Sequence, residues 1–412
     1  MEQRYELFVG VDWGSEAHQV AVIDGDRHLL AQRSIEHSGL ALSQLVDWLA
    51  GKADPSRIAI AIEVPRGPVV ETLVERGFQV FSLNPKQLDR FRDRHTAAGA
   101  KDDRRDAFVL ADSLRTDQPA FRRVRLDDPL IIQLRELSRM DEDLQKQLSR
   151  LSNQLREQLN RFYVQILKIC PAADEPWAWS LLELVPTPAQ GARVRVAAVK
   201  RVLRENRIRR LTADDVIAAL KEPALVVAPG ATEAASKHIE YLLPALQLAS
   251  QQRKRCGKEI EALLETLGSE ENEPGQNREH RDVQILQSFP GVGRIVAATM
   301  LAEASQPLGD RDYNTLRAQA GSAPVTYQSG KKLTVRMRRA CNPRLRNALY
   351  SWSQANVRSD PTGRKAYAEL RAKGHGHARA LRTIADRLLR VLISMLRTGT
   401  LYDPARRGLA VA

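Results

Sequence analysis

The amino-acid sequence predicts an α/β domain followed by a mostly helical remainder, and three observations support this class. Apolar runs rich in Val and Ile, bounded by turn-forming residues, recur through residues 1–115 and are typical of buried strands. Residues 130–169 instead place leucines at the 4-3 spacing of a long helix. The 412-residue chain is long enough for two or three domains, and its clearest linker is the polar, turn-rich segment 268–280.

Five strands are expected in the N-terminal part of the chain. They are residues 5–11, 19–24, 29–35, 57–63 and 78–83. Gly25 and Asp26 form a turn between the second and third strands, so the first three should make an antiparallel meander. A helical stretch near residues 40–50 then leads to the fourth strand. This order is that of a ribonuclease-H-like (RuvC-like) domain, which we expect over residues 1–125.

The leucine spacing over residues 130–169 predicts one long amphipathic helix with coiled-coil character, in which Asp141 is the one polar seam position. A second helix should run from about Ile239 to Leu267, interrupted by Pro244. The two helices could form an antiparallel hairpin within one chain or a dimerisation stalk. Prolines and short apolar runs between them indicate a small helical insert at about 171–235. We expect this middle domain over residues 126–270.

The net charge of +13 is unevenly distributed along the chain. Residues 331–412 contain nineteen Lys and Arg against four Asp and Glu, a local charge of +15, which leaves −2 for the other 330 residues. An excess confined to one fifth of the chain predicts binding to a polyanion such as nucleic acid. The same segment carries apolar residues at helical spacing, so it should fold rather than form a solubilising tail.

Cysteine usage and hydropathy point to the cell interior. Cys170, Cys256 and Cys341 lie far apart and match no zinc or disulfide spacing, which indicates a reducing compartment. No apolar run reaches membrane-spanning length, and the first residues do not start a signal peptide. We therefore expect a cytoplasmic protein without a membrane partner.

Four acidic residues stand where a metal-dependent nuclease would need them. Asp12 and Glu63 each end an apolar run, and a carboxylate at the end of a buried strand is unfavourable unless a cation neutralises it. Asp103 and Asp106 open a helical stretch and, three residues apart, share one face. Together they could hold two Mg²⁺ or Mn²⁺ ions ~4 Å apart, as phosphoryl transfer requires. Each acid alone could instead form a turn or cap a helix.

Two C-terminal segments carry further candidate residues. Gly291 and Gly293 lie in a Pro-Gly-Val-Gly turn followed by Arg294, which resembles a helix-hairpin-helix and would let backbone N–H groups approach a phosphate. The alternative is a tight interhelical turn without a ligand. Ser329 lies in a flexible Ser-Gly-Lys-Lys segment, where its hydroxyl could meet a DNA phosphate or be only a turn residue. The basic residues expected to bind nucleic acid beside it are Lys331, Lys332, Arg336, Arg338 and Arg339.

The motifs together resemble those of the DEDD transposases of IS110 and IS1111 insertion elements, relatives of the Piv DNA invertases. They are Val9-Gly10-Val11-Asp12, Ile62-Glu63, Leu83-Asn84-Pro85, Lys101 to Ala107, Phe289 to Gly293, Ala318 to Pro324, Gln328-Ser329-Gly330 and Asn342 to Tyr350. By this resemblance the acidic tetrad falls on Asp12, Glu63, Asp103 and Asp106, and the nucleophilic serine on Ser329. Asp102 replaces the usual Thr, so either Asp102 or Asp103 could be the ligand. Only Asp103 keeps the i, i+3 relation to Asp106.

The resemblance implies a bacterial, nucleoid-associated recombinase that moves an insertion element. It implies donor and target DNA as substrates, and a noncoding bridge RNA whose base pairing selects both. It also implies a homodimer that becomes a tetramer in the synaptic complex, with each active site built from the acidic domain of one subunit and the serine domain, residues 281–412, of another. Ser329 would attack the scissile phosphate and form a phosphoserine link, assisted by Mg²⁺ or Mn²⁺ on the tetrad.

Two other functions fit parts of the sequence. A nuclease of the Holliday-junction-resolving type would use only the tetrad and a metal-activated water, with Ser329 and the basic segment merely binding DNA. A non-catalytic scaffold would use the leucine-rich helix as its working part. The complete tetrad disfavours the scaffold, and the Gln-Ser-Gly segment favours the recombinase over the nuclease.

Overall fold

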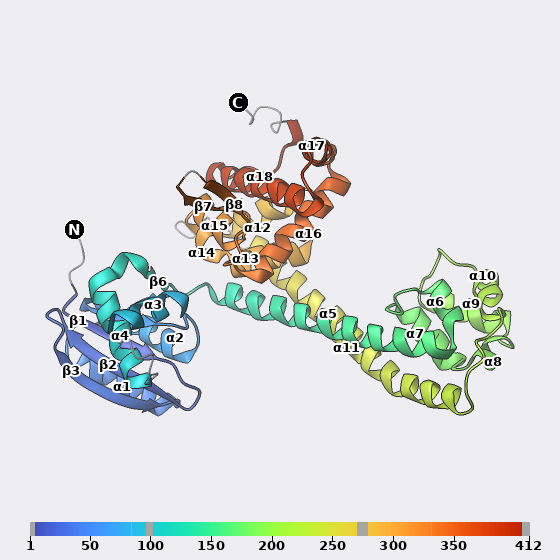
Figure 1. Cartoon of the computed structure of the whole chain (residues 1–412), viewed down its shortest axis with the longest axis horizontal. Coiled ribbons are helices and arrows are strands. Elements are labelled where there is room, and N and C mark those ends of the chain that lie inside the picture. The colour runs from blue at the N-terminus through green and yellow to red at the C-terminus, as the bar shows by residue number, and fades with distance from the viewer. Residues whose placement is uncertain (1–4, 84, 96–101, 270–278, 331, 406–412) are drawn as a thin grey trace. The chain divides into compact units, whose positions relative to one another are not determined.

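The computed structural model describes residues 5–83, 85–95, 102–269, 279–330 and 332–405. The chain divides into two compact units, Met1–Asp127 and Asp128–Ala412. The first is mixed α/β and the second is mostly helical (Figure 1), as the sequence predicted. Among the residues that the structure describes, no helix is long and apolar enough to cross a membrane.

The first unit is built on a six-stranded sheet with the order β3-β2-β1-β4-β5-β6. The strands β1, β2 and β3 form the expected antiparallel meander, while β4 and β5 run parallel to β1 and β6 is antiparallel to β5. The strands are β1 (Leu7–Asp12), β2 (Ala17–Asp24), β3 (Leu29–Glu36), β4 (Ile58–Ile62), β5 (Gln79–Ser82) and β6 (Arg122–Arg123). The five longest lie within two residues of the predicted bounds.

Helices cover both faces of this sheet, because the central strands are apolar on both sides. Val9 and Val11 point to a core shared with α1 and α2, whereas Phe8 belongs to a second core shared with α3 and α4. The helical elements are α1 (Gly39–Ala50), η1 (Pro55–Arg57), α2 (Pro68–Glu75), α3 (Pro85–His95), α4 (Asp103–Asp117) and η2 (Gln118–Ala120). Successive residues of β1 therefore contact helices on opposite faces of the sheet.

Two long antiparallel helices, α5 (Pro129–Phe162) and α11 (Ala231–Ser269), pack side by side within one chain in the second unit (Figure 1). The Cys256 thiol donates to the Leu137 carbonyl oxygen at 3.2 Å. The seam residue Asp141 is buried and pairs with Arg253 at 3.2 Å. Of the two predicted arrangements, the structure shows the hairpin within the chain.

Three details of these helices differ from the sequence prediction. The predicted helix 130–169 is broken at Tyr163, which separates α5 from α6 (Val164–Ile169). The second helix runs through Pro244 without a break, because Pro244 lies on its exposed side, where water can satisfy the freed carbonyl group. The predicted linker lies largely at 270–278, outside the described residues, and its flanking positions are helical in α11 and α12 (Glu279–Gln287).

The insert between α5 and α11 is a small helical cluster, here called the tip. Its remaining helices are α7 (Pro176–Leu184), α8 (Pro188–Gly191), α9 (Val196–Glu205) and α10 (Ala213–Leu220). Trp177 and Trp179 are fully buried in a core that also contains the end of α5 and the first half of α11. The tip therefore packs against the end of α5 and the first half of α11.

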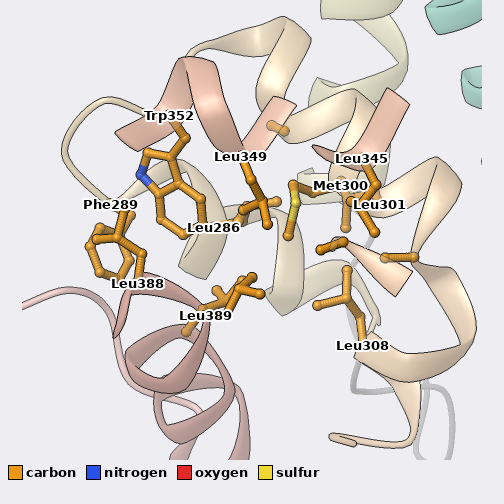
Figure 2. Packing of buried hydrophobic residues seen from close by; sticks show 14 of the residues in the cluster. Leu286, Phe289, Met300, Leu301, Leu308, Leu345, Leu349, Trp352, Leu388 and Leu389 are labelled. Carbon is orange, nitrogen blue, oxygen red and sulfur yellow. The ribbon is translucent and has the colours of Figure 1, made fainter. Parts of the chain in front are cut away.

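The C-terminal part folds around a second apolar core. Figure 2 shows Phe289, Trp352 and Leu388 among its members. The start of α5 and the end of α11 join this core through residues such as Leu134 and Ile260. Its elements are α12, α13 (Arg294–Glu303), α14 (Ser305–Gly309), α15 (Tyr313–Gln319), β7 (Val325–Ser329), β8 (Lys332–Arg336), α16 (Pro343–Ser359), α17 (Pro361–Ala372) and α18 (His377–Thr398).

Candidate active site

Two neighbouring parallel strands carry the first two acids. Asp12 is the last residue of β1, and Glu63 directly follows β4. In the parallel register Val11 lies opposite Ile62, so Asp12 and Glu63 come next on adjacent strands. The carboxyl ends of parallel strands meet at one edge of a sheet, which is where ligands bind in open α/β folds.

The first turns of α4 bring the other two acids to the same edge. Asp12, Asp103 and Asp106 each offer a carboxylate oxygen, and these three atoms lie within 4.8 Å of one another. Asp106 is only 2% exposed, Asp12 is half-buried and Asp103 is exposed. Three carboxylates this close form a group that could hold a divalent metal ion.

A close approach of α4 to β1 makes this grouping possible, and it depends on Gly10. A Cβ atom at Gly10 would overlap the Ala107 carbonyl oxygen and lie 2.7 Å from the Ala111 backbone nitrogen. Any other residue at this position would therefore push α4 away from β1. Gly10 lies two residues before Asp12, and Ala107 directly follows Asp106, so the contact sets the spacing of the acids.

The acids affect one another's ionisation. Burial, reinforced by the negative charges of Asp106, Asp103 and Glu63, raises the pKa of Asp12 from 3.8 to about 6, and the Arg92 guanidinium opposes this rise. Glu63 contributes to this shift and lines the same pocket as Asp12 and Asp103, although it does not belong to the group of three acids whose oxygens lie within 4.8 Å of one another. The sequence-predicted tetrad is thus gathered in one place by the first unit alone.

Arg92 on α3 is a member of the site that sequence reasoning missed. Its Nε donates to Asp106 Oδ1 at 2.8 Å and its Nη2 to Asp106 Oδ2 at 2.7 Å, while its Nη1 donates to Asp89 at 2.7 Å. This bidentate pair neutralises the most buried acid of the tetrad. In the sequence, Arg90, Arg92 and Arg94 alternate along one helix, and nothing there distinguishes Arg92 from its neighbours.

Asp102 has a different role from the acids beside it. It is the N-cap of α4, and its side chain accepts a hydrogen bond from the Arg104 backbone N–H at 3.1 Å. Asp103 is the first residue of the helix proper, and it joins the acidic group with Asp106. The structure thus places Asp103 rather than Asp102 in the group, as the i, i+3 spacing predicted.

A pocket of about 250 Å³ opens at the acids. Besides Asp12, Glu63, Asp103 and Arg92, it is lined by Trp13, Gly14, Ala17 and Gln19. Trp13 is 43% exposed, which is unusual for a tryptophan and leaves its ring available to a substrate. Neither Trp13 nor Gln19 was predicted, because a single aromatic or amide side chain near a strand end belongs to no recognisable sequence motif.

A histidine pair, made of the buried His18 and the exposed His37, holds the loop that follows Asp12. The Gly14 N–H donates to His18 Nδ1 at 3.3 Å, so the proton of His18 sits on Nε2 and faces His37 Nδ1 at 2.9 Å. Burial and the neighbouring His37 lower the pKa of His18, which keeps this imidazole neutral. The loop between β1 and β2 is therefore fixed next to the acids.

Ser329 lies in the second unit, on an exposed hairpin. It is the last residue of β7 and pairs with Lys332 of β8 across a turn in which Gly330 has a φ of 55°. The expected flexible segment is thus a strand end with a tight turn. Tyr327, Leu333 and Val335 on the same hairpin are 56%, 63% and 60% exposed.

The basic residues around this hairpin are mostly exposed. Lys332, Arg336 and Arg339 are exposed and Arg338 is half-buried, while Lys331 lies outside the described residues. The Arg336 guanidinium stands over the Tyr327 ring, 5.5 Å from its centroid. A strand end bearing a hydroxyl among cations offers direct contacts to a phosphate.

The Pro-Gly-Val-Gly turn has a packing role at its first glycine. Gly291 has a φ of 86°, and a Cβ there would lie 2.8 Å from the Asn356 backbone nitrogen in α16. Gly293 is the exposed N-cap of α13 with open space around it. Arg294 pairs with Glu261 at 3.4 Å, across the surface of α11. The tight packing at Gly291 fits a tight interhelical turn without a ligand. At Gly293, by contrast, the backbone is exposed and has open space beside it.

Comparisons with known proteins cover nearly the whole chain. The family model for DEDD transposases of IS110 elements matches residues 9–164, and the model described as "Transposase IS116/IS110/IS902 family" matches residues 283–368. The acidic tetrad lies in the first matched region and Ser329 in the second.

Individual relatives agree with these models. The mini-circle putative transposase for IS117 of Streptomyces coelicolor is 32% identical over 98% of this chain and 97% of its own length. The putative transposase y4uE of Sinorhizobium fredii is 44% identical, but the match spans only 52% of this chain and 60% of that protein. An uncharacterised 42 kDa protein of insertion element IS900 from Mycobacterium paratuberculosis is 26% identical over 97% of this chain. The chain therefore belongs to the IS110/IS116 family of insertion-element transposases.

Proposed function

We propose that this transposase cuts and rejoins DNA through a covalent link to Ser329, with a divalent metal held by Asp12, Glu63, Asp103 and Asp106. The observation that carries the proposal is the crowding of the acids. Three carboxylate oxygens lie within 4.8 Å of one another, and the group raises the pKa of Asp12 to about 6. Such crowding is unfavourable without a cation.

The donor set suits Mg²⁺ or Mn²⁺. All candidate ligands are carboxylate oxygens, which hard divalent cations prefer, and the pocket beside them is open to a substrate. Arg92 donates to both carboxylate oxygens of Asp106 and also to Asp89, so one guanidinium is shared between two acids and the acidic group keeps a net negative charge for a metal. When bound, the metal would polarise the scissile phosphate and stabilise the negative charge that develops there. The strand order β3-β2-β1-β4-β5 supports a RuvC-like domain in this role.

Ser329 supplies the nucleophile in this proposal. Its Oγ loses its proton to solvent and forms a bond to phosphorus, the bond from phosphorus to one sugar oxygen breaks, and that oxygen takes up a proton from solvent and leaves as a hydroxyl. The phosphodiester is replaced by a phosphoserine ester, so a later attack by a DNA hydroxyl can rejoin strands without an external energy source. The exposed position of Ser329 at a strand end, beside Lys332, supports this role.

The site is completed by a second subunit in this proposal. The acids lie in one compact unit and Ser329 in the other, so the internal fold of neither unit brings them together. A two-stranded hairpin with three exposed apolar side chains is marginally stable alone and suits burial against another protein surface. A homodimer, paired into a tetramer on donor and target DNA, would supply that surface.

A bridge RNA selects the DNA sites in this proposal, and the protein supplies contacts to nucleic-acid backbones. The excess of +15 over residues 331–412 supports backbone binding of this kind, which does not depend on base sequence. Sequencing of the RNA that copurifies with the protein tests this part. A single enriched RNA from the flank of the element is expected, and random cellular RNA would contradict it.

A hydrolytic endonuclease of the resolvase type is the second candidate. The observation that favours it is that the first unit alone gathers the tetrad, Arg92 and a pocket with an exposed tryptophan. A water molecule in place of Ser329 would then attack the phosphate. The two candidates differ in the fate of the phosphodiester energy, which hydrolysis discards.

Replacing Ser329 distinguishes the two candidates. Wild-type protein with its copurified RNA and a donor–target DNA pair should yield an SDS-resistant protein–DNA adduct and recombinant product. Ser329→Ala should lose both while its melting temperature rises with Mg²⁺ as in wild type. Ser359→Ala, at an exposed serine on α16, is the matched control and should recombine normally. Normal recombination by Ser329→Ala would leave the hydrolytic candidate standing.

A further inference from the structure

The surface of the tip around α9 carries a concentrated positive charge. Eight of the 18 residues in 193–210 are Arg or Lys and one is acidic, a local charge of +7. All eight basic side chains are exposed. Arg210 pairs with Glu175, and none of the other seven forms an ion pair with a residue that the structure describes. We call these seven residues the tip basic cluster: Arg193, Arg195, Lys200, Arg201, Arg204, Arg207 and Arg209.

The members of the tip basic cluster that belong to α9 lie on one side of this helix. Val199, Val202 and Leu203 are the buried residues of α9, so they mark its inner face. At ~100° per residue, Lys200, Arg201 and Arg204 span an arc of about 100° on the opposite face. Arg193 and Arg195, just before the helix, line one hollow of about 380 Å³. Three of the positive side chains therefore share one side of α9, and two others line the same hollow.

The stability of α9 does not explain these charges. Cations near a helix C-terminus are favourable, which accounts for Arg204 and Arg207. Arg193 and the N-cap residue Arg195 stand at the opposite end, where a cation opposes the helix dipole. Lys200 and Arg204 are also like charges four residues apart, which is destabilising. Both effects destabilise α9, so these charges are better explained by binding than by folding.

We propose that the tip basic cluster binds the phosphate backbone of double-stranded DNA, as a second DNA-binding surface separate from the C-terminal basic segment. A surface with a local charge of +7 is complementary to the duplex backbone, which carries one negative charge per ~1.7 Å of its axis. Segment 193–210 contains no aromatic residue, whereas surfaces for single strands stack bases on aromatic side chains. The cluster therefore suits a duplex rather than a single strand.

The two basic surfaces are far apart in the second unit. The first turns of α5 pack in the C-terminal core and its last turns in the tip core. A 34-residue helix is about 50 Å long, which corresponds to roughly 15 base pairs of duplex. The tip cluster thus contacts duplex DNA well outside the base pairs held by the C-terminal segment.

The test compares two full-length variants with the same change in charge. The tip variant carries Arg193→Gln, Lys200→Gln, Arg201→Gln and Arg204→Gln. The control variant carries Arg150→Gln, Arg156→Gln, Lys254→Gln and Lys258→Gln, at exposed positions of α5 and α11. Affinity for a 60-base-pair duplex is measured between about 50 and 300 mM salt, together with affinity for a 60-nucleotide single strand and an RNA hairpin.

The tip variant should bind the duplex about tenfold more weakly near 150 mM salt. Its slope of log K against log salt should be shallower than the wild-type slope by about 2 to 4, since each phosphate contact contributes ~0.9. The control variant should keep the wild-type slope, and single-strand binding by the tip variant should change less than duplex binding. Melting of the tip variant should match or exceed wild type, because like charges are removed.

Two results would overturn the proposal. Equal slopes for the tip and control variants would mean that the cluster does not contact the duplex. A larger loss of affinity for the RNA hairpin than for the duplex would assign the surface to RNA. If the tip variant with four substitutions loses helix content, the double variant Lys200→Gln with Arg204→Gln decides the same question. About half the change in slope is then expected.

Discussion

At the scale of single residues, the four acids were predictable and their neighbours were not. Each acid lies at or directly after the end of a strand or in the first turn of a helix, and those positions follow from apolar periodicity. Arg92, Trp13 and Gln19 line the same pocket, but their places depend on how α3 and the loop after β1 fold in three dimensions. A site residue without a periodic signal is visible only in the folded structure.

Asp12 offers a direct test of the acidic group through its pKa, which is raised from 3.8 to about 6 in the folded protein. A carboxyl group with a raised folded pKa contributes stability below about pH 4, and that contribution is lost as the pH rises through about 6. In EDTA, the melting temperature of wild type relative to Asp12→Asn should therefore fall between pH 4 and pH 7. Differential scanning fluorimetry across this range measures it.

Metal should reverse this loss, because a bound cation favours the ionised acids. At pH 7.5, Mg²⁺ or Mn²⁺ should raise the melting temperature of wild type by several degrees and that of Asp12→Asn much less. Strand cleavage by Asp12→Asn should be abolished. Asp47→Asn, at an exposed acid of α1, is the control and should respond to metal like wild type. An equal metal response of Asp12→Asn would contradict a metal site at Asp12.

At the scale of elements, the strands of the first unit lie close to their predicted positions, since each apolar run is long and sharply bounded. The helices of the second unit were harder to delimit. The break at Tyr163 and the continuity through Pro244 both depend on tertiary packing. Ser329 was expected in a flexible segment, but alternating residues on both sides of Gly330 pair into a hairpin.

The packing of α4 on β1 yields a prediction at Gly10. Gly10→Ala should force α4 away from β1, because the new methyl group would overlap the Ala107 carbonyl oxygen. Overpacking of this kind costs about 1–3 kcal/mol, and a displacement of ~1 Å at a catalytic group can lower the rate about 100-fold. We expect a lower melting temperature, weaker stabilisation by Mg²⁺ and strongly reduced cleavage.

Gly25→Ala is the matched control for this prediction. Gly25 lies in the turn between β2 and β3 of the same sheet, and a Cβ there would have no atom within 4 Å. Its melting temperature and cleavage rate should stay close to those of wild type. If Gly10→Ala cleaves DNA as fast as Gly25→Ala, the spacing between α4 and β1 does not control the acidic group.

At the scale of the whole molecule, the net charge summed over long segments did not reveal the tip basic cluster. The net charge of −2 over residues 1–330 suggested that only the C-terminal fifth binds a polyanion. That sum hides +7 within 193–210, which acidic residues elsewhere in the chain offset. In the folded tip all eight basic side chains of this segment are exposed, so this local positive charge lies on the surface around α9. Local charge on a folded surface, rather than the sum over a segment, indicates a binding site.

The proposal that one subunit supplies the acids and another supplies the serine predicts complementation between two inactive variants. Asp12→Asn lacks an intact acidic group and Ser329→Ala lacks the nucleophile, so each alone should form no adduct. Coexpression gives mixed oligomers. If the site is shared between subunits, one site in each mixed dimer pairs the intact acids of Ser329→Ala with the intact serine of Asp12→Asn. Adduct formation should then return to a substantial fraction of the wild-type level.

Coexpression of Asp12→Asn with Glu63→Gln is the matched control. Both changes lie in the acidic group of the first unit, so no arrangement of mixed subunits restores a complete tetrad. This pair should stay inactive on the same DNA, whatever the number of subunits. Complementation by the first pair alone would support a shared site. Should both pairs stay inactive while mixed oligomers are demonstrated by differential tags, each site takes its acids and its serine from the same chain, and the two units of one subunit must meet directly on DNA.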